Sequence, residues 1–249
     1  MTVEEILDEL TYYDGTFPRT ALEQAVARKE SITPQLLSIL EDAADDPEGL
    51  PSGYMAHVYA MFLLAQFREE RAYPLIVDFV SHPGEVVMDV CGDLVTEDLG
   101  RILASVSGGD PSLMKSVVED GDAHEYVRSA ALTGLVSLVV CGEMSRQAVM
   151  EYLHQLFHED IPREKTIVWS ALVATALDLY PEGEVYEDIE QAYADDMVAS
   201  DFVGPDDVEW TLSRGKEKIL KSTREDAHHH LVEDVIDEMG WWACFHRFR

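Results

Sequence analysis

Three charged side chains, Asp93, Glu97 and Arg101, stand four positions apart in the sequence. On a helix, residues four apart share a face, so two carboxylates and a guanidinium would lie in one line. The functional interpretation is a polar ligand or partner site in a groove. The alternative is a solvated helix face, whose ion pairs contribute on the order of a few tenths of a kcal/mol. These three residues are our candidate binding site.

Histidines form the second set of candidates. His154 and His158 are also four apart, a spacing that lets two imidazoles bind one metal ion. The catalytic glutamate of an HExxH zincin is missing, and a solvated outer helix face is the simpler explanation. Residues 228–230 are three adjacent histidines, but neighbours on a helix point about 100° apart and cannot all face one ion. We therefore expect no cofactor and no bound metal, and name His154 and His158 as the residues that a metal site would use.

The elements that would position these residues follow from the hydrophobic pattern. Residues 125–160 predict two amphipathic helices, because apolar side chains recur at helical spacing on both sides of a short polar turn. Gly142 would stop the first helix and Ser145 would cap the second. Neither helix can bury its apolar stripe alone, so the pair needs similar pairs beside it.

The Asp93, Glu97 and Arg101 line depends on a second long element. Residues 86–106 predict one helix with an intact apolar stripe on the opposite side. This helix would contain Gly92 and Gly100, each about 1 kcal/mol less favourable than alanine. We expect that the backbone there is approached closely by a neighbour or a ligand.

Helix pairs of this kind recur roughly every 35–40 residues, which is the range of HEAT-like repeats. No segment alternates long enough to need a sheet. We predict an all-α, HEAT-like α-α superhelix of stacked antiparallel helix pairs in one domain, residues 1–249. Residues 1–50 would be N-terminal capping helices and residues 51–200 the helix pairs. Residues 201–249 would be C-terminal helices, over residues 206–221 and 225–239, with an aromatic cap on the last unit.

Charge and composition limit the partners. The chain has 49 acidic and 18 basic residues, a net charge of −31, which repels phosphate backbones and argues against nucleic acid. A basic protein or peptide is favoured, although adaptation to salt would also explain the acidity. The longest apolar run, Ala130–Cys141, is too short to cross a bilayer, and the acidic N-terminus is not a secretory signal. We expect a cytoplasmic protein without a membrane segment.

The stretch GDLVTEDLGRILAS (Gly92–Ser105), the later YVRSAAL and the ending GWWACF resemble an uncharacterised bacterial family. This family is known as a domain of unknown function with HEAT-like repeats, and the resemblance runs from about Pro18 to Phe245. It implies the fold and no activity. Some members carry a cysteine-rich zinc motif of the SEC-C type near the C-terminus. Here only Cys244 and His246 are nearby, so that site is not transferred.

The function predicted from these observations is a non-catalytic protein- or peptide-binding scaffold. No GxSxG, P-loop, GxGxxG or HExxH motif is present, which lowers the expectation of catalysis without excluding it. The alternative is an enzyme, or a lyase-like or chaperone-like binder of a small ligand, that uses Asp93, Glu97 and Arg101. A deep pocket where the carboxylates converge would favour the alternative, and a shallow groove would favour the scaffold.

Overall fold

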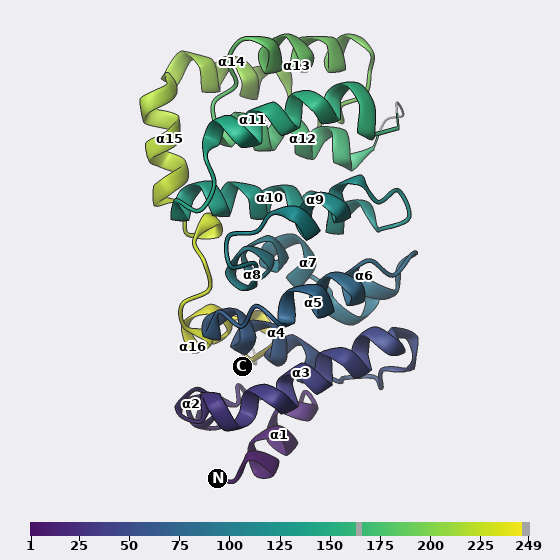
Figure 1. The fold of residues 1–249 in the computed structure, drawn as a ribbon, viewed down its shortest axis with the longest axis vertical. Coiled ribbons are helices and arrows are strands. Elements are labelled where there is room, and N and C mark those ends of the chain that lie inside the picture. Colours follow the sequence, from purple (N-terminus) through teal and green to yellow (C-terminus); the bar gives the residue numbers. More distant parts are fainter. Residues whose placement is uncertain (163–165, 246–249) are drawn as a thin grey trace.

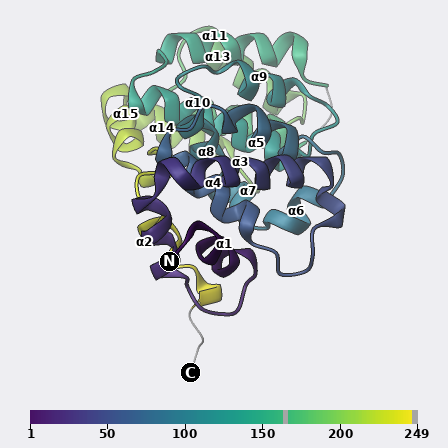
Figure 2. The same ribbon diagram turned by 60° about the horizontal axis from the view of Figure 1, so that its bottom comes forward.

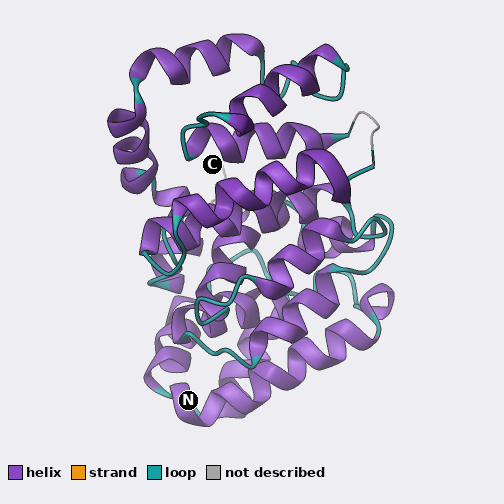
Figure 3. Ribbon diagram, turned by 45° about the horizontal axis from the view of Figure 1, so that its top comes forward, coloured by secondary structure: helices purple, strands orange, loops and turns teal. Residues whose placement is uncertain are grey.

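The computed structural model describes residues 1–162 and 166–245, and all regular elements in these two ranges are helices (Figure 3). Two isolated β-bridges occur, but no strand forms there. The predicted all-α class is confirmed. Residues 246–249, including His246, lie outside the described residues. Within the described ranges, no helix is both long enough and apolar enough to span a membrane.

The α-helices are α1 (Val3–Thr11), α2 (Arg19–Ala27), α3 (Lys29–Asp45), α4 (Ala56–Phe67), α5 (Ala72–Val80), α6 (Val86–Cys91), α7 (Leu94–Glu97), α8 (Leu99–Val106), α9 (Ser112–Glu119), α10 (Glu125–Cys141), α11 (Arg146–Gln155), α12 (Ile167–Asp178), α13 (Glu184–Ala194), α14 (Pro205–Arg214), α15 (Lys216–Glu225) and α16 (Val235–Met239). The short elements are the 3-10 helices η1 (Pro47–Gly49), η3 (Ala227–His229) and η4 (Ala243–Phe245), and the π-helix η2 (Leu156–Asp160).

Two rows of helices make up the body of the molecule (Figure 1). In one row α4 contacts α8, α8 contacts α10 and α10 contacts α12. In the other, α3 contacts α5, α5 contacts α9, and α11 contacts α13. The rows are joined by contacts of α3 with α4, α9 with α10, and α12 with α13. Each helix thus buries its apolar stripe against helices of both rows, and the core is continuous along the body.

The helix pair predicted over residues 125–160 is confirmed. Gly142 ends α10 in the left-handed conformation, with φ 87°. The Ser145 hydroxyl caps α11 by accepting a hydrogen bond from the backbone N–H of Ala148 at 3.1 Å. After Gln155 the helix widens into the π-helix η2, which carries His158. Local signals were sufficient here because a stop and a cap act within one turn.

The prediction of one helix over residues 86–106 is wrong. Gly92 has φ 56° and ψ −137°, a conformation that only glycine adopts easily, and it ends α6. A second break at Asp98, with φ −126°, separates α7 from α8. Gly100 does mark a close approach, as expected, and the neighbour is a helix. A Cβ at Gly100 would lie 2.6 Å from the backbone oxygen of Ala130 in α10.

The C-terminal part follows a different path from the predicted one. Gly215, with φ 82°, separates α14 from α15, so the predicted helix over residues 206–221 is divided. The predicted helix over residues 225–239 is also wrong, because residues 230–234 have no regular structure before α16 begins. This segment returns along the body, and α16 contacts α2 and α4 (Figures 1 and 2).

The aromatic tail therefore does not cap the last helix pair, and that expectation is wrong. The Trp242 ring lies edge-on against Phe62 of α4, with centroids 5.6 Å apart. Phe245 packs on Phe17, and the Tyr13 hydroxyl donates to the backbone oxygen of Cys244 at 2.5 Å. The tail packs here because the first helices leave aromatic surface uncovered, and burying it is favourable.

The two adjacent tryptophans of the tail give a matched test of this packing. We expect Trp242→Ala to lower the free energy of unfolding by about 2 kcal/mol, since its ring packs on Phe62. Trp241→Ala should change it by less than about 0.5 kcal/mol, because Trp241 is 67% exposed. Urea unfolding followed by circular dichroism measures both values. Equal effects of the two substitutions would contradict the packing described above.

Candidate functional site

Arg101 points into the interior of the protein. It is only 7% exposed. Its Nη1 and Nη2 donate to the two carboxylate oxygens of Glu238 at 2.9 and 2.7 Å, and its Nε donates to the backbone oxygen of His230 at 2.6 Å. Nη1 also lies 3.2 Å from Oδ1 of Asp98. Because the helix is broken and Arg101 is used internally, the predicted line with Asp93 and Glu97 does not form.

Asp98 is the acidic group most affected by this arrangement. Burial raises its pKa to about 6; Arg101 opposes that rise, while the negative charges of Glu238 and Glu97 add to it. The guanidinium of Arg101 forms ion pairs with two carboxylates, and both oxygens of Glu238 accept hydrogen bonds from it. Burial and the neighbouring negative charges therefore make Asp98 easier to protonate than an ordinary aspartate.

Asp93 and Glu97 remain exposed and line a cavity of about 520 Å³. Asp98 joins them in its wall, and Trp241 and Trp242 of the tail form the aromatic part. Two of the three predicted site residues, Asp93 and Glu97, therefore line one cavity. The third, Arg101, does not line it, and two tryptophans of the tail do. Sequence reasoning missed these tryptophans as site residues, because no local pattern connects the tail to α7.

The returning segment is held through its backbone by side chains of the body. Val232 donates its N–H to Oγ of Ser105 at 2.9 Å, and its carbonyl accepts from Nη1 of Arg68 at 2.6 Å. The N–H of Val235 donates to Oε1 of Gln66 at 3.0 Å. These bonds satisfy backbone groups that no helix satisfies. Side chains at α4 and α8 thus recognise an irregular, partly extended chain.

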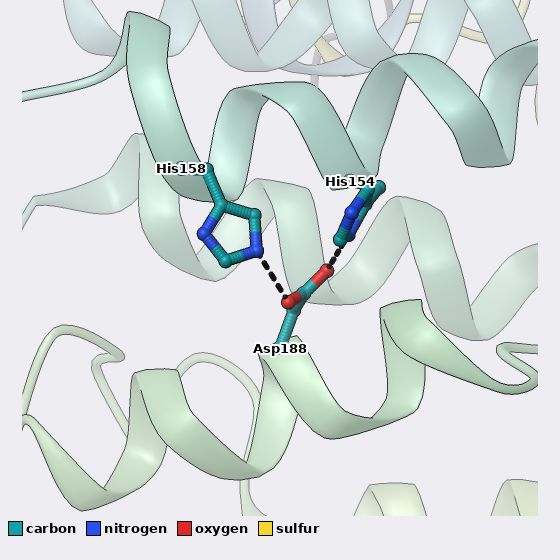
Figure 4. Close-up of side chains that lie close together, drawn as sticks. All are labelled: His154, His158 and Asp188. Atoms are coloured by element: carbon teal, nitrogen blue, oxygen red, sulfur yellow. Dashed lines mark hydrogen bonds and ion pairs between the residues drawn. The ribbon is translucent and has the colours of Figure 1, made fainter.

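His154 and His158 converge on one carboxylate, that of Asp188 in α13 (Figure 4). Nδ1 of His154 lies 2.6 Å from Oδ2 of Asp188, and Nε2 of His158 lies 2.9 Å from Oδ1. The two imidazole centroids are 4.8 Å apart. The Asp188 side chain is 8% exposed, whereas those of His154 and His158 are 40% and 56% exposed.

Sequence reasoning also missed Asp188. It lies 34 residues from His154, so no spacing rule connects the two. The predicted order of helix pairs was the available signal, because α11 and α13 are neighbours in the same row.

The histidine tract at residues 228–230 does not form one site. Its members have three different partners. His228 lies 2.9 Å from Asp226, His229 3.6 Å from Asp178, and His230 2.8 Å from the backbone oxygen of Arg224. The tract lies in the 3-10 helix η3 and the bend after it, not in the expected α-helix, and the three side chains point to separate partners.

The chain is similar to known proteins along almost its whole length. The model of a family described as "Protein of unknown function (DUF1186)" matches residues 1–246. An uncharacterized protein of Chlamydia muridarum is 37% identical over 246 residues, which cover 97% of each chain. One of Chlamydia trachomatis is 35% identical over 249 residues, covering 97% of this chain and 96% of that protein. No solved structure matches. The expected membership of an uncharacterised family is confirmed, and the chain belongs to the DUF1186 family of proteins of unknown function.

Proposed function

We propose that this protein is a non-catalytic, HEAT-like scaffold that binds a basic segment of a partner protein. In this proposal the two rows of helices form one α-α superhelix in a single domain. Residues 1–50 cap it, residues 51–200 supply the helix pairs, and residues 201–249 contain the C-terminal helices, of which residues 226–245 return along the body. The observation that carries the proposal is a cavity, open to solvent on the side of the exposed Asp93, Glu97 and Trp241, in which these residues meet Asp98 and Trp242. An open cavity of this kind favours a scaffold over an enclosed catalytic site.

The chemistry of this cavity suits a lysine or arginine side chain. The aliphatic stem of such a residue packs on an indole face, and its charge is attracted both by the ring and by nearby carboxylates. The net charge of −31 adds a long-range attraction for basic partners and speeds their encounter. Arg101 does not oppose this attraction within the cavity, because its charge is paired with Glu238.

A second observation favours an extended polypeptide, and not the surface of a folded protein, as the bound partner. Gln66, Arg68 and Ser105 already bind the backbone of residues 232–235. The same body can thus hold an irregular chain by its main-chain groups, as grooves that bind peptides do. The cavity adjoins this segment, since Trp241 and Trp242 follow α16 directly.

The test is a titration of the protein with a lysine-rich peptide of about ten residues, followed by calorimetry. We expect Asp93→Asn with Glu97→Gln to weaken binding at least tenfold without lowering the melting temperature, because both side chains are exposed. A peptide with glutamine in place of lysine should not bind.

The matched control removes the same charge elsewhere. Asp89→Asn with Glu48→Gln neutralises two exposed carboxylates that do not line the cavity. This control should keep the affinity within about twofold. If both double variants lose affinity equally, only the overall charge matters and the cavity is not the binding site. Unchanged affinity in the Asp93 and Glu97 variant would also reject the proposal.

The alternative function, an enzyme or a binder of a small ligand, has one observation in its favour. Asp98 lines the same cavity, and burial raises its pKa to about 6, near the range in which a carboxyl group can exchange protons at neutral pH. A small organic amine that displaces the lysine-rich peptide, and whose binding is lost in Asp98→Asn, would favour this alternative over the scaffold.

A further inference from the structure

We infer that His154, His158 and Asp188 form a binding site for a divalent first-row transition metal ion. One ligand atom from each residue lies within 4.8 Å of the others, with the imidazoles and the carboxylate facing one another (Figure 4). The sequence supplied only the two histidines, and a pair of ligands is not enough for a site. The third ligand, from a different helix, changes that expectation.

The donor set selects the class of metal. Two imidazole nitrogens and one carboxylate oxygen suit Zn²⁺, Co²⁺, Ni²⁺ or Fe²⁺, whereas Mg²⁺ and Ca²⁺ prefer oxygen ligands alone. Three protein ligands leave one or more positions for water or another group. The exposure of both histidines leaves room for those positions on the solvent side. The strongly negative chain further favours a bound cation.

Binding of an ion requires the ligand atoms to move. Ligand atoms on one tetrahedral zinc ion lie about 3.3 Å apart, given metal–ligand bonds of about 2.0–2.1 Å. The two histidine–carboxylate distances, 2.6 Å to Oδ2 and 2.9 Å to Oδ1, must widen by less than about 1 Å, and the ligand atoms that are up to 4.8 Å apart must approach by up to about 1.5 Å. The half-exposed imidazoles can make this shift. Asp188 provides the fixed ligand, because its side chain is almost completely buried on α13.

The π-helix contributes to the convergence of the two histidines. His154 lies in α11 and His158 in η2, so the wider turn falls between them. Single π-turns inside helices are frequently found at functional sites. A bound ion would join α11 and η2 to α13, and would therefore stabilise the contact between two neighbouring helices of one row.

The test is calorimetric titration of EDTA-treated protein with Zn²⁺, together with visible absorption of the Co²⁺ complex. We expect one ion per chain and a rise of several degrees in the melting temperature with Zn²⁺. His158→Gln and Asp188→Asn should each weaken Zn²⁺ binding at least tenfold and abolish the rise. Circular dichroism of the metal-free variants shows that they are folded before titration.

His228→Gln is the matched control, since it also removes an exposed histidine beside an aspartate. It should bind Zn²⁺ with the affinity of the unaltered protein. The inference is overturned if the unaltered protein binds no stoichiometric Zn²⁺, or if both cluster variants keep its affinity. Loss of binding in His228→Gln instead of the cluster variants would place the ion at residues 228–230 and overturn it equally.

Discussion

Replacing Arg101 by methionine should destabilise the protein by about 3 kcal/mol or more, because it leaves Glu238 and Asp98 without their shared cation. Removing one partner of a buried ion pair typically costs about 3–5 kcal/mol, since the remaining charge is desolvated and unpaired. Arg101 is 7% exposed and holds both oxygens of Glu238. It also donates to the backbone of His230, so the returning segment loses two attachments at once.

Urea unfolding measures this loss, and limited proteolysis measures detachment of residues 226–245. Arg71→Met is the matched control, because Arg71 also pairs through two nitrogens with one carboxylate, that of Glu69, but is 67% exposed. The control should lose much less stability than Arg101→Met, because an exposed ion pair is screened by solvent. The double variant Arg101→Met with Glu238→Met should lose less than the two single losses added. A loss below about 1 kcal/mol in Arg101→Met would show that this cluster does not hold the segment.

Gly100→Ala should destabilise the protein by about 2–3 kcal/mol, although alanine is the better helix former by about 1 kcal/mol. The new Cβ would lie 2.6 Å from the backbone oxygen of Ala130 and 3.0 Å from the backbone nitrogen of Gly134. Neither atom belongs to a flexible side chain that could turn away. Relief of the overlap therefore requires α8 and α10 to separate, which loosens a contact within the row.

Thermal and urea unfolding give the loss, and Gly121→Ala is its control. A Cβ at Gly121 would meet no heavy atom within 4 Å, and its φ is not positive, so alanine there should change the stability by less than about 0.5 kcal/mol. Gly134→Ala should destabilise the protein as well, because its Cβ would lie 2.9 Å from the backbone oxygen of Gly100 and 2.6 Å from the sulfur of the buried Met114. A stabilising Gly100→Ala would mean that the two helices are not in close backbone contact.

Several features of this protein can be predicted from the amino-acid order, because the interactions that cause them join residues only a few positions apart. Thr2 and Glu5 form the capping box that opens α1 and lie only three positions apart. The end of α10 at Gly142 and the start of α11 at Ser145 depend on hydrogen bonds within one turn. The all-α class follows from apolar periodicity, and the family follows from matching residues along the chain.

Other features could not be predicted because their causes are distant in the sequence. Helical spacing places Arg101 on an exposed face, but its partner Glu238 lies 137 residues away. A charged residue can be buried only if an oppositely charged or hydrogen-bonding group lies next to it. The periodicity of the sequence does not show whether a distant segment supplies that group. The break at Gly92 could not be predicted either, since a glycine within a helical pattern is compatible with a close helix–helix contact or with the end of the helix.

Local hydrogen bonding and apolar spacing establish the all-α class and the boundary at Gly142 and Ser145 from the amino-acid order alone, since each of these depends on neighbours a few positions apart. The net charge of −31 follows from composition alone. The course of residues 226–245, the cavity between α7 and the tail, and the meeting of His154 with Asp188 arise from packing between segments that are 30 or more residues apart. These three features depend on how the apolar faces of distant segments are buried against one another, which is a property of the whole fold.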